Sequence, residues 1–378
     1  MTSARRDEVM GHRATPARRP PPAGAGPLAW VRANLFSSPL NAALTLVGVW
    51  ITWTAAYAIV DWALVRAVFT GSDGSACAKE GAGACWPFVT AKLDQFIYGR
   101  YPAAERWRAD LTMALFAAGL AGVMIPGVPR KGWIAAFLLI AFPAIAYVLL
   151  TGGHFGLAVV ETEMWGGLLD TLVVAVVGIV ASFPIALALA LGRRSRLPFV
   201  RWSSIGFIEL VRGVPLITML FMASVMLPLF LPEGVTFDKL ARALIGVALF
   251  EGAYLAEVIR GGLQAIPRGQ YEAADALGLS YPQKIGLVVM PQALRLVIPG
   301  IVNSFIALFK DTSLVLIIGL FDLLGIVQQA VSSDTTWLSP STPLTGYVFA
   351  GFVFWVFCFG MSRYAQRIER RLDEGQHR

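Results

Sequence analysis

Long apolar stretches separated by short polar segments are the dominant pattern of this 378-residue chain. Apolar side chains make up 56% of the residues and charged ones 15%, which is too apolar for a soluble domain of this size. Several stretches approach or exceed the roughly 20 residues that a helix needs to cross a bilayer. Because helices satisfy their own backbone hydrogen bonds in lipid, the pattern predicts an all-α polytopic membrane protein.

About eight transmembrane helices are predicted from these stretches. Their approximate ranges are 42–69, 111–125, 133–150, 165–191, 205–231, 240–259, a span that starts near 294, and 344–361. A further apolar stretch at 313–324 is expected to form a re-entrant or a continued helix. Pro215 lies inside the fifth span, where we expect a kink.

Basic residues gather in the tails and in short loops between the predicted spans. Several arginines follow the fourth span, whereas residues 332–343 contain an aspartate and no basic residue. Since cytoplasmic loops carry an excess of Lys and Arg, both termini are predicted to be cytoplasmic. Membrane orientation therefore accounts for the net charge of +7, which does not indicate nucleic-acid binding.

Polar segments divide the chain into regions. Residues 1–36, rich in Arg, Pro, Ala and Gly, are predicted to form a disordered cytoplasmic tail. Residues 37–155 hold the first three spans and a polar external loop at 70–110. Residues 369–378 are expected to form a second cytoplasmic tail.

The cysteines, histidines and lysines offer little chemistry. Cys77 and Cys85 share the external loop, where an oxidising compartment would allow a disulfide, and two free thiols also fit the sequence. Three histidines are too few and too scattered for a metal cluster. No lysine precedes Ser or Thr, so the chain lacks a G-x-x-x-x-G-K-[ST] phosphate loop. We expect no catalytic residue, metal site or cofactor in this chain.

A polar stretch between the sixth and seventh spans, within residues 263–295, has strong helix punctuation. Good helix formers lead to Gly278, where a glycine can take the left-handed conformation that ends a helix. Ser280 can cap a second helix, with Gln283 completing a capping box. Pro291 is expected to end that helix. The pattern predicts two short helices that form a compact knob outside the bilayer.

This knob resembles the EAA loop of ABC-importer permease subunits. The family pattern is Glu-Ala-Ala, three residues, Gly, nine residues, Ile, one residue and Leu-Pro, and here Val288 and Met290 replace Ile and Leu. In the family, the loop is the coupling helix that sits in a groove of a cytoplasmic ATPase. The resemblance implies that the coupling residues are Glu272, Ala273, Ala274, Gly278 and Pro291.

Other segments look like the permeases of histidine, glutamate and glutamine importers. They are Arg212–Ile217, Gly252–Gln270, Val289–Arg295 and Phe309–Leu314. The resemblance implies a five-helix permease core over about 156–368, preceded by three additional helices. Those extra helices and the stretch Trp165–Leu172 resemble the M-type permease of the general L-amino acid importer. Asp170 departs from the expected apolar or neutral residue.

The resemblance also implies a function and a set of partners. The chain would be a permease subunit in a bacterial inner membrane that passes polar or general L-amino acids into the cytoplasm. Its partners would be cytoplasmic ABC ATPase subunits that bind ATP and Mg, a second homologous permease, a periplasmic amino acid-binding protein and membrane lipid. The chain itself would catalyse no covalent step.

A few charged residues lie within or near the predicted spans, where charges are costly and often functional. Glu257 and Arg260 can form an i,i+3 pair that either seats a helix end or lines the substrate path. Lys310 and Asp311 are either a snorkelling lysine beside a capping aspartate or a polar gate. Arg212 carries a similar ambiguity.

Two other classes of membrane protein also fit parts of the pattern. An ion-coupled secondary transporter would need polar ion sites at mid-membrane and would work without an ATPase. A membrane scaffold would have no substrate path and would not bind an ATPase through the EAA loop. Reconstitution of the chain alone and co-purification with an ATPase distinguish these alternatives.

Overall fold

The computed structural model describes residues 26–125, 127–230, 232 and 237–376. These residues are almost entirely helical, with two isolated β-bridges. The prediction of an all-α polytopic protein is confirmed. The chain divides into two compact units, Met1–Val65 and Arg66–Arg378, which are described separately. Most of the predicted N-terminal tail, residues 1–25, lies outside the described residues.

The first unit contains one candidate membrane span. Helix α1 covers Pro27–Leu35, so this part of the predicted disordered tail is helical. Helix α2 covers Pro39–Val60 and continues as a π-helical turn to Val65, and the whole segment is apolar enough to cross a membrane. The Asn41 N–H donates a hydrogen bond of 3.1 Å to the Ser38 hydroxyl, which caps the start of α2.

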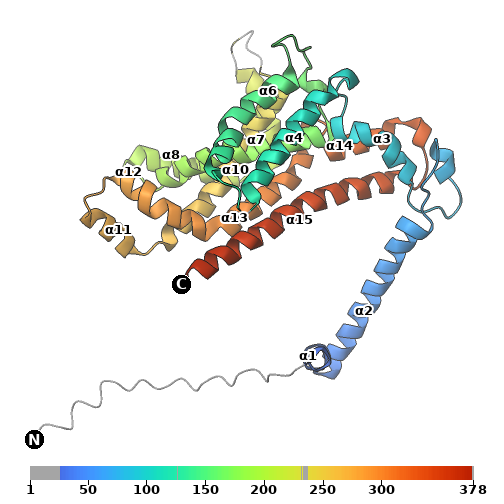
Figure 1. Ribbon diagram of the computed structural model, residues 1–378, viewed down its shortest axis with the longest axis horizontal. Coiled ribbons are helices and arrows are strands. Elements are labelled where there is room, and N and C mark those ends of the chain that lie inside the picture. The colour runs from blue at the N-terminus through green and yellow to red at the C-terminus, as the bar shows by residue number, and fades with distance from the viewer. Residues whose placement is uncertain (1–25, 126, 231, 233–236, 377–378) are drawn as a thin grey trace, which may run out of the picture. The chain divides into compact units, whose positions relative to one another are not determined.

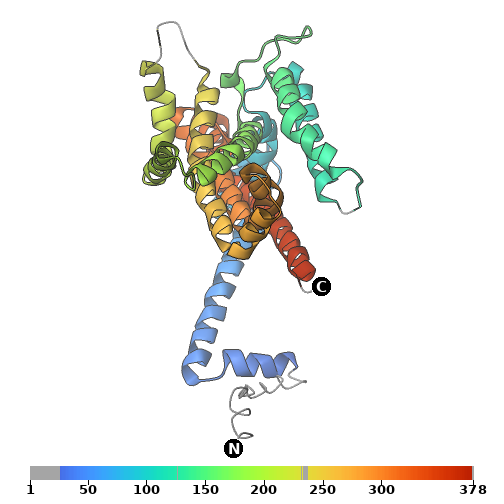
Figure 2. The same cartoon turned by 90° about the vertical axis from the view of Figure 1, so that its left-hand side faces the viewer.

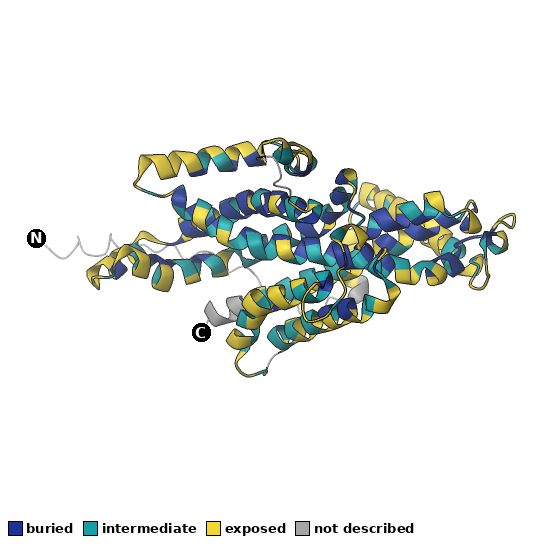
Figure 3. Ribbon diagram, turned by 90° about the horizontal axis from the view of Figure 1, so that it is seen from above, coloured by how far each residue is buried: buried dark blue, intermediate teal, exposed yellow. Residues whose placement is uncertain are grey.

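The second unit is organised around helix α10, Lys239–Ala265, which packs lengthwise against two neighbours (Figure 1). The neighbours are α7, Gly167–Gly192, and α13, Met290–Asp311. A Cβ on Gly252 would come within 2.7 Å of Ile185, so a glycine allows α7 and α10 to approach closely. Buried residues, the class coloured dark blue in Figure 3, recur along the length of α10 and include Leu255 and Ile259.

The remaining helices of the second unit flank this core. They are α3 (Trp86–Tyr98), α4 (Arg106–Met124), α5 (Lys131–Ala136), α6 (Phe142–Thr151), α8 (Pro198–Arg212), α9 (Leu216–Phe221), α11 (Arg268–Ala276), α12 (Tyr281–Gln283), α14 (Leu323–Ser333) and α15 (Thr342–Gln376). Helices α4 and α5–α6 run as a hairpin, teal to green in Figure 2. Because α15 is helical through Gln376, the predicted tail from residue 369 begins inside a helix.

Five described helices are long and apolar enough to cross a membrane, or six if one bent pair counts as a single span. They are Pro39–Val65, Lys131–Thr151, Gly167–Gly192, Tyr281–Ile318 and Thr342–Arg370, and the bent pair is Pro198–Arg212 with Leu216–Phe230. The other two predicted spans correspond to α4 and α10, which carry charged side chains. Each of the eight predicted spans therefore has a helical counterpart.

The fifth predicted span differs from the structure. It was expected to cross the membrane as one kinked helix, but α8 and the following helix meet at an angle of 106°. Pro215 has no N–H to donate and restricts the residue before it, so the helix ends at Arg212 and a new one begins at Leu216. Trp202 is 66% and Leu210 71% exposed on α8, which gives this amphipathic helix an apolar outer face.

The seventh predicted span also differs. Instead of ending near Pro291, the helix that starts at Tyr281 continues without a break to Ile318. A π-helical segment, Lys284–Val289, precedes Pro291. The N–H that this proline lacks therefore falls where regular α-helical hydrogen bonding is already interrupted. The helix then ends at Gly319, whose φ of +74° is left-handed. The apolar stretch at 313–324 thus continues the helix briefly and then turns.

The loop at residues 70–110, which was predicted to be external, is a folded element. A disulfide joins Cys77 and Cys85, and Cys358 is a free cysteine. The Cys85 N–H donates a hydrogen bond of 2.8 Å to the Thr345 hydroxyl, which attaches this element to α15. Lys92 forms an ion pair with Asp334, and its hydrogen bond lowers the pKa of that carboxyl.

Candidate functional site

The connection between α10 and α13 forms the predicted two-helix knob, which we call the coupling loop (residues 266–289). Helix α11 starts after Pro267 and ends at Ala276, and Gly278 has a φ of +72°. The Gly278 N–H donates to the Asp275 carbonyl at 2.9 Å, and the Leu279 N–H donates to the Ala274 carbonyl at 3.2 Å. The expected left-handed glycine at the end of the first helix is therefore present.

The second half of the coupling loop is capped as expected. The Ser280 N–H donates a hydrogen bond of 2.9 Å to Gln283 Oε1, which is the reciprocal half of a capping box. Lys284 Nζ lies 2.5 Å from Asp275 Oδ1 and thereby joins the two short helices. These contacts hold the loop in one compact shape.

Exposure differs sharply among the residues of the EAA motif. Ala274 is only 2% exposed, so its small side chain is needed for packing within this chain. Glu272 and Ala273 are exposed on the surface of α11. At the tip of the loop, Leu277 is 78% and Tyr281 56% exposed. These two large side chains are therefore accessible at the surface of the loop.

Arg194 and Tyr271 attach the coupling loop to the ends of two membrane helices. Arg194 follows α7, and its Nη1 donates to the Tyr271 hydroxyl at 3.0 Å and to the Leu263 carbonyl at 3.2 Å. The Tyr271 hydroxyl donates to the same carbonyl at 3.1 Å. Gln292 Nε2, on α13, donates to Gln270 Oε1 at 3.1 Å. Hydrogen bonds therefore attach α11 to α10, to α13 and to the residue that follows α7.

The sequence analysis did not assign these attachments. No role for Arg194 or Tyr271 was predicted from the sequence. The hydrogen-bonding partners are 8 to 77 positions apart in the chain, so local patterns carry no signal for them.

Glu257 is the centre of a cluster of charged residues at the ends of α7, α8 and α10. Its carboxylate lies 2.6 Å from Arg193 Nη1, 2.6 Å from Arg260 Nη2 and 3.8 Å from Arg212 Nη1. Arg193 also lies 3.0 Å from Glu209. The predicted i,i+3 pair of Glu257 and Arg260 is present, and the structure adds Arg193 and Arg212. We call these five residues the Glu257 cluster.

Lys310 and Asp311 do not belong to this cluster. They occupy the last turn of α13, where Lys310 is exposed and Asp311 is half-buried. Among the described residues neither side chain has a recorded ion pair, and the Asp311 side chain does not cap the helical turn that follows it. Of the two alternatives for this pair, the structure does not support the capping aspartate, and the polar gate stays a prediction.

Two of the buried carboxyl groups in the described residues have oxygens without a hydrogen-bond partner. Asp170, in the first turn of α7, is 2% exposed, and within the described part of the chain neither of its oxygens has a hydrogen-bond partner. Glu251, in the middle of α10, is 5% exposed and has one such oxygen. The sequence analysis noted Asp170 and missed Glu251, although an acidic residue inside a predicted span is itself a functional signal. No group of three or more His, Cys, Asp or Glu among the described residues could hold a metal ion.

Comparison with known proteins gives a clear match. Residues 182–374 match the model of the family described as binding-protein-dependent transport system inner membrane component. The chain is 52% identical to the inner membrane amino-acid ABC transporter permease protein YhdY of Escherichia coli (strain K12), over 92% of this chain and 94% of that protein. It is 40% identical to the glutamate/glutamine/aspartate/asparagine transport system permease protein BztC of Rhodobacter capsulatus, over 98% of each chain.

A solved structure is also similar. It is described as an amino acid ABC transporter with histidines, and is 28% identical with a TM-score of 0.47. The match covers 54% of this chain and 92% of that chain.

Proposed function

Because the chain belongs to the family of binding-protein-dependent transport system inner membrane components, we propose that it is the permease subunit of an ABC importer for polar L-amino acids. The observation that carries this proposal is the 52% identity, over nearly the whole chain, to an amino-acid ABC transporter permease. The chain is a multi-pass protein of the inner membrane, and the ATPase is a separate subunit. Family membership decides against the secondary transporter and the scaffold.

The coupling loop is proposed to dock onto a cytoplasmic ABC ATPase, which binds ATP and Mg. Support comes from the exposed apolar tip at Leu277 and Tyr281 and from the left-handed turn at Gly278 that holds the loop compact. A second permease subunit and a periplasmic amino acid-binding protein complete the proposed importer. Pro291 lies in the continuous helix beyond the loop, so its proposed contribution is to the joint between loop and span.

Transport is proposed to follow from movement of this loop. When the ATPase subunits close on ATP, α11 moves with them, and its attachments through Tyr271 and Gln270 shift α7, α10 and α13. ATP binding thus stabilises one arrangement of the helices over the other, which makes transport directional. The Glu257 cluster, which ties α7, α8 and α10 together, is proposed as a gate that holds one of these arrangements. Lys310 and Asp311 are proposed to line the substrate path.

The experiment that tests this function is reconstitution in vesicles. We expect the chain alone to be inert, and uptake of labelled L-glutamate and L-glutamine to require a partner ATPase, the second permease, the binding protein and ATP. Uptake by the chain alone, driven by an ion gradient, would exclude the proposal.

Both termini are proposed to be cytoplasmic, because arginines follow α7 and none occur at residues 332–343. In a Cys358→Ser background, a cysteine replacing Arg196 should be protected from a membrane-impermeant thiol reagent in intact cells. A cysteine replacing Ser333, at the end of α14, should be labelled. The reverse accessibility at both positions would contradict the orientation.

A further inference from the structure

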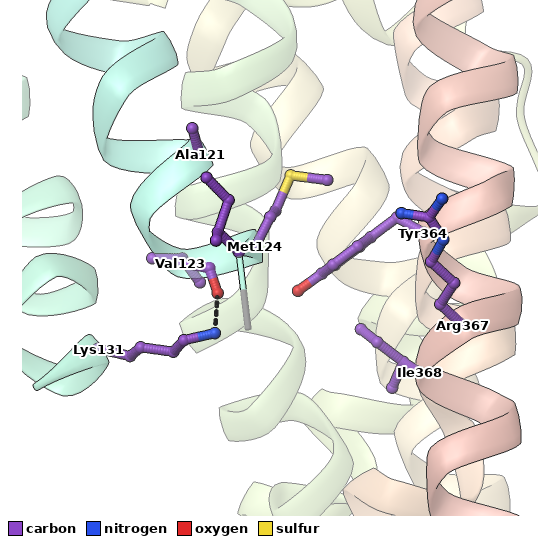
Figure 4. A pocket seen from close by; sticks show the side chains of 8 residues that line it. Ala121, Val123, Met124, Lys131, Tyr364, Arg367 and Ile368 are labelled. Atoms are coloured by element: carbon purple, nitrogen blue, oxygen red, sulfur yellow. Dashed lines mark hydrogen bonds between the residues drawn. The ribbon is translucent and has the colours of Figure 1, made fainter. Parts of the chain in front are cut away.

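A pocket of about 380 Å³ lies between the α4–α5 connection and the C-terminal part of α15 (Figure 4). Met124 and Tyr364 extend toward each other from opposite sides of it. The complete lining is Ala121, Val123, Met124, Ile125, Lys131, Tyr364, Arg367 and Ile368. The pocket is therefore a largely apolar space with two cationic side chains, and no acidic residue is part of its described lining.

The two cations have donors available for a ligand. Lys131 Nζ uses one hydrogen bond, of 2.8 Å, to the Val123 carbonyl, and an ammonium group has three donors. Arg367 is exposed, and the described chain gives it no ion-pair partner. A guanidinium group suits the oxygens of a phosphate because it presents several donors in one plane. The side chains together favour an anionic group with oxygen acceptors.

The pocket also lies at the level where lipid headgroups are found. Lys131 is the first residue of the candidate span Lys131–Thr151, and Arg367 is close to the end of the candidate span Thr342–Arg370. Basic pockets between membrane helices, at the boundary with water, are suited to anionic lipid headgroups. The apolar walls formed by Met124, Ile125 and Ile368 would contact an acyl chain and not a dissolved ion.

We propose that this pocket binds an anionic phospholipid whose headgroup lies between Lys131 and Arg367, with an acyl chain along Met124 and Ile125. The lipid would fill the space between the α4–α6 hairpin and α15. This inference is independent of the coupling loop, which is formed by other helices. It assigns a ligand to the N-terminal helices, for which the transport mechanism has no role.

The test uses the intact importer, purified in detergent and mixed with dioleoylphosphatidylglycerol or dioleoylphosphatidylcholine. Native mass spectrometry then measures how many lipids remain bound. We expect preferential retention of phosphatidylglycerol, and we expect Lys131→Gln or Arg367→Gln to reduce it about fivefold each, since each basic residue near an anionic headgroup contributes about that factor. Arg201→Gln, an exposed arginine of α8 outside the pocket, is the matched control and should leave retention unchanged.

Two further arms make the proposal falsifiable. Met124→Trp fills the apolar wall without changing charge and should lower retention of phosphatidylglycerol, whereas inorganic phosphate at millimolar concentration should not displace the lipid. Equal retention of the two lipids, equal effects of Arg201→Gln and Arg367→Gln, or displacement by phosphate would each overturn the lipid assignment. Uptake by each variant is measured in parallel, so that a folding defect is recognised.

Discussion

Gly278→Val is expected to reduce amino acid uptake about fivefold or more while the protein reaches the membrane at normal levels. No atom lies within 4 Å of the position where a Cβ would stand, so the defect is conformational and not steric. At φ +72°, a β-branched residue costs on the order of 1–3 kcal/mol, and each 1.4 kcal/mol corresponds to about a factor of ten. The strained loop would tilt relative to the ATPase.

Gly278→Asn is the matched control for this substitution. Asparagine tolerates the left-handed conformation better than other side chains, so this variant should retain most of the uptake. Uptake and ATP hydrolysis by the whole complex in vesicles are the measurements. If Gly278→Val transported as well as the parent, the left-handed turn would have no part in coupling.

Substitutions at the exposed Ala273 and the buried Ala274 distinguish a defect in ATPase docking from a defect in folding. Ala273→Trp places a large side chain on the exposed surface of α11 and should weaken ATPase retention while the loop keeps its shape. Ala274→Trp, at a position that is 2% exposed, should instead disturb packing inside this chain. The smallness of Ala274 alone would have suggested a partner contact, and only its burial shows that the neighbour belongs to the same subunit.

Glu257→Gln is expected to cause the second large effect. The substitution removes the charge that Arg193 and Arg260 contact at 2.6 Å, and leaves these partly buried guanidinium groups without their shared partner. Loss of a hydrogen bond to a charged group costs roughly 1.5–3 kcal/mol, and partial exposure of the arginines places the expected destabilisation at the lower end. We expect a lower thermal unfolding temperature in detergent and, if the cluster is a gate, ATP hydrolysis that no longer depends on the binding protein.

Glu209→Gln provides the comparison within the same cluster. Glu209 contacts the same Arg193 at 3.0 Å, but its side chain is 58% exposed. A solvent-exposed pair contributes little, so this variant should behave almost like the parent. Equal effects of the two substitutions on unfolding and on ATP hydrolysis would mean that the less exposed carboxylate, Glu257, has no special role.

Local rules predicted the coupling loop more accurately than the spans around it. Gly278 and the Ser280–Gln283 capping box depend only on neighbouring residues, so the sequence was sufficient for them. The two prolines show where local rules fail. Pro215 lies between two helices that meet at 106°, whereas Pro291 lies inside a continuous helix. The difference arises from the π-helical turn before Pro291, which no residue type signals.

Long-range contacts account for most of what the sequence could not supply. The partners of Glu257 include Arg193, 64 positions earlier, which becomes its neighbour only when α7 packs against α10. Glu251 was missed for a related reason. Helix α10 contains several polar residues, so its sequence does not show that the helix lies at the centre of the unit and buries Glu251. Resemblance to known permeases identified the family, whereas these contacts required the fold.

We propose that the coupling loop transmits the action of a partner ATPase to this permease. The most direct measurement is ATP-driven uptake of labelled L-glutamate by vesicles that contain the complete complex, with Leu277→Asp compared with the parent. Leu277 is 78% exposed, so the added charge alters the docking surface without disturbing the fold. We expect the variant to insert normally but to lose both the bound ATPase and uptake. Full uptake with a normally bound ATPase would contradict this proposal.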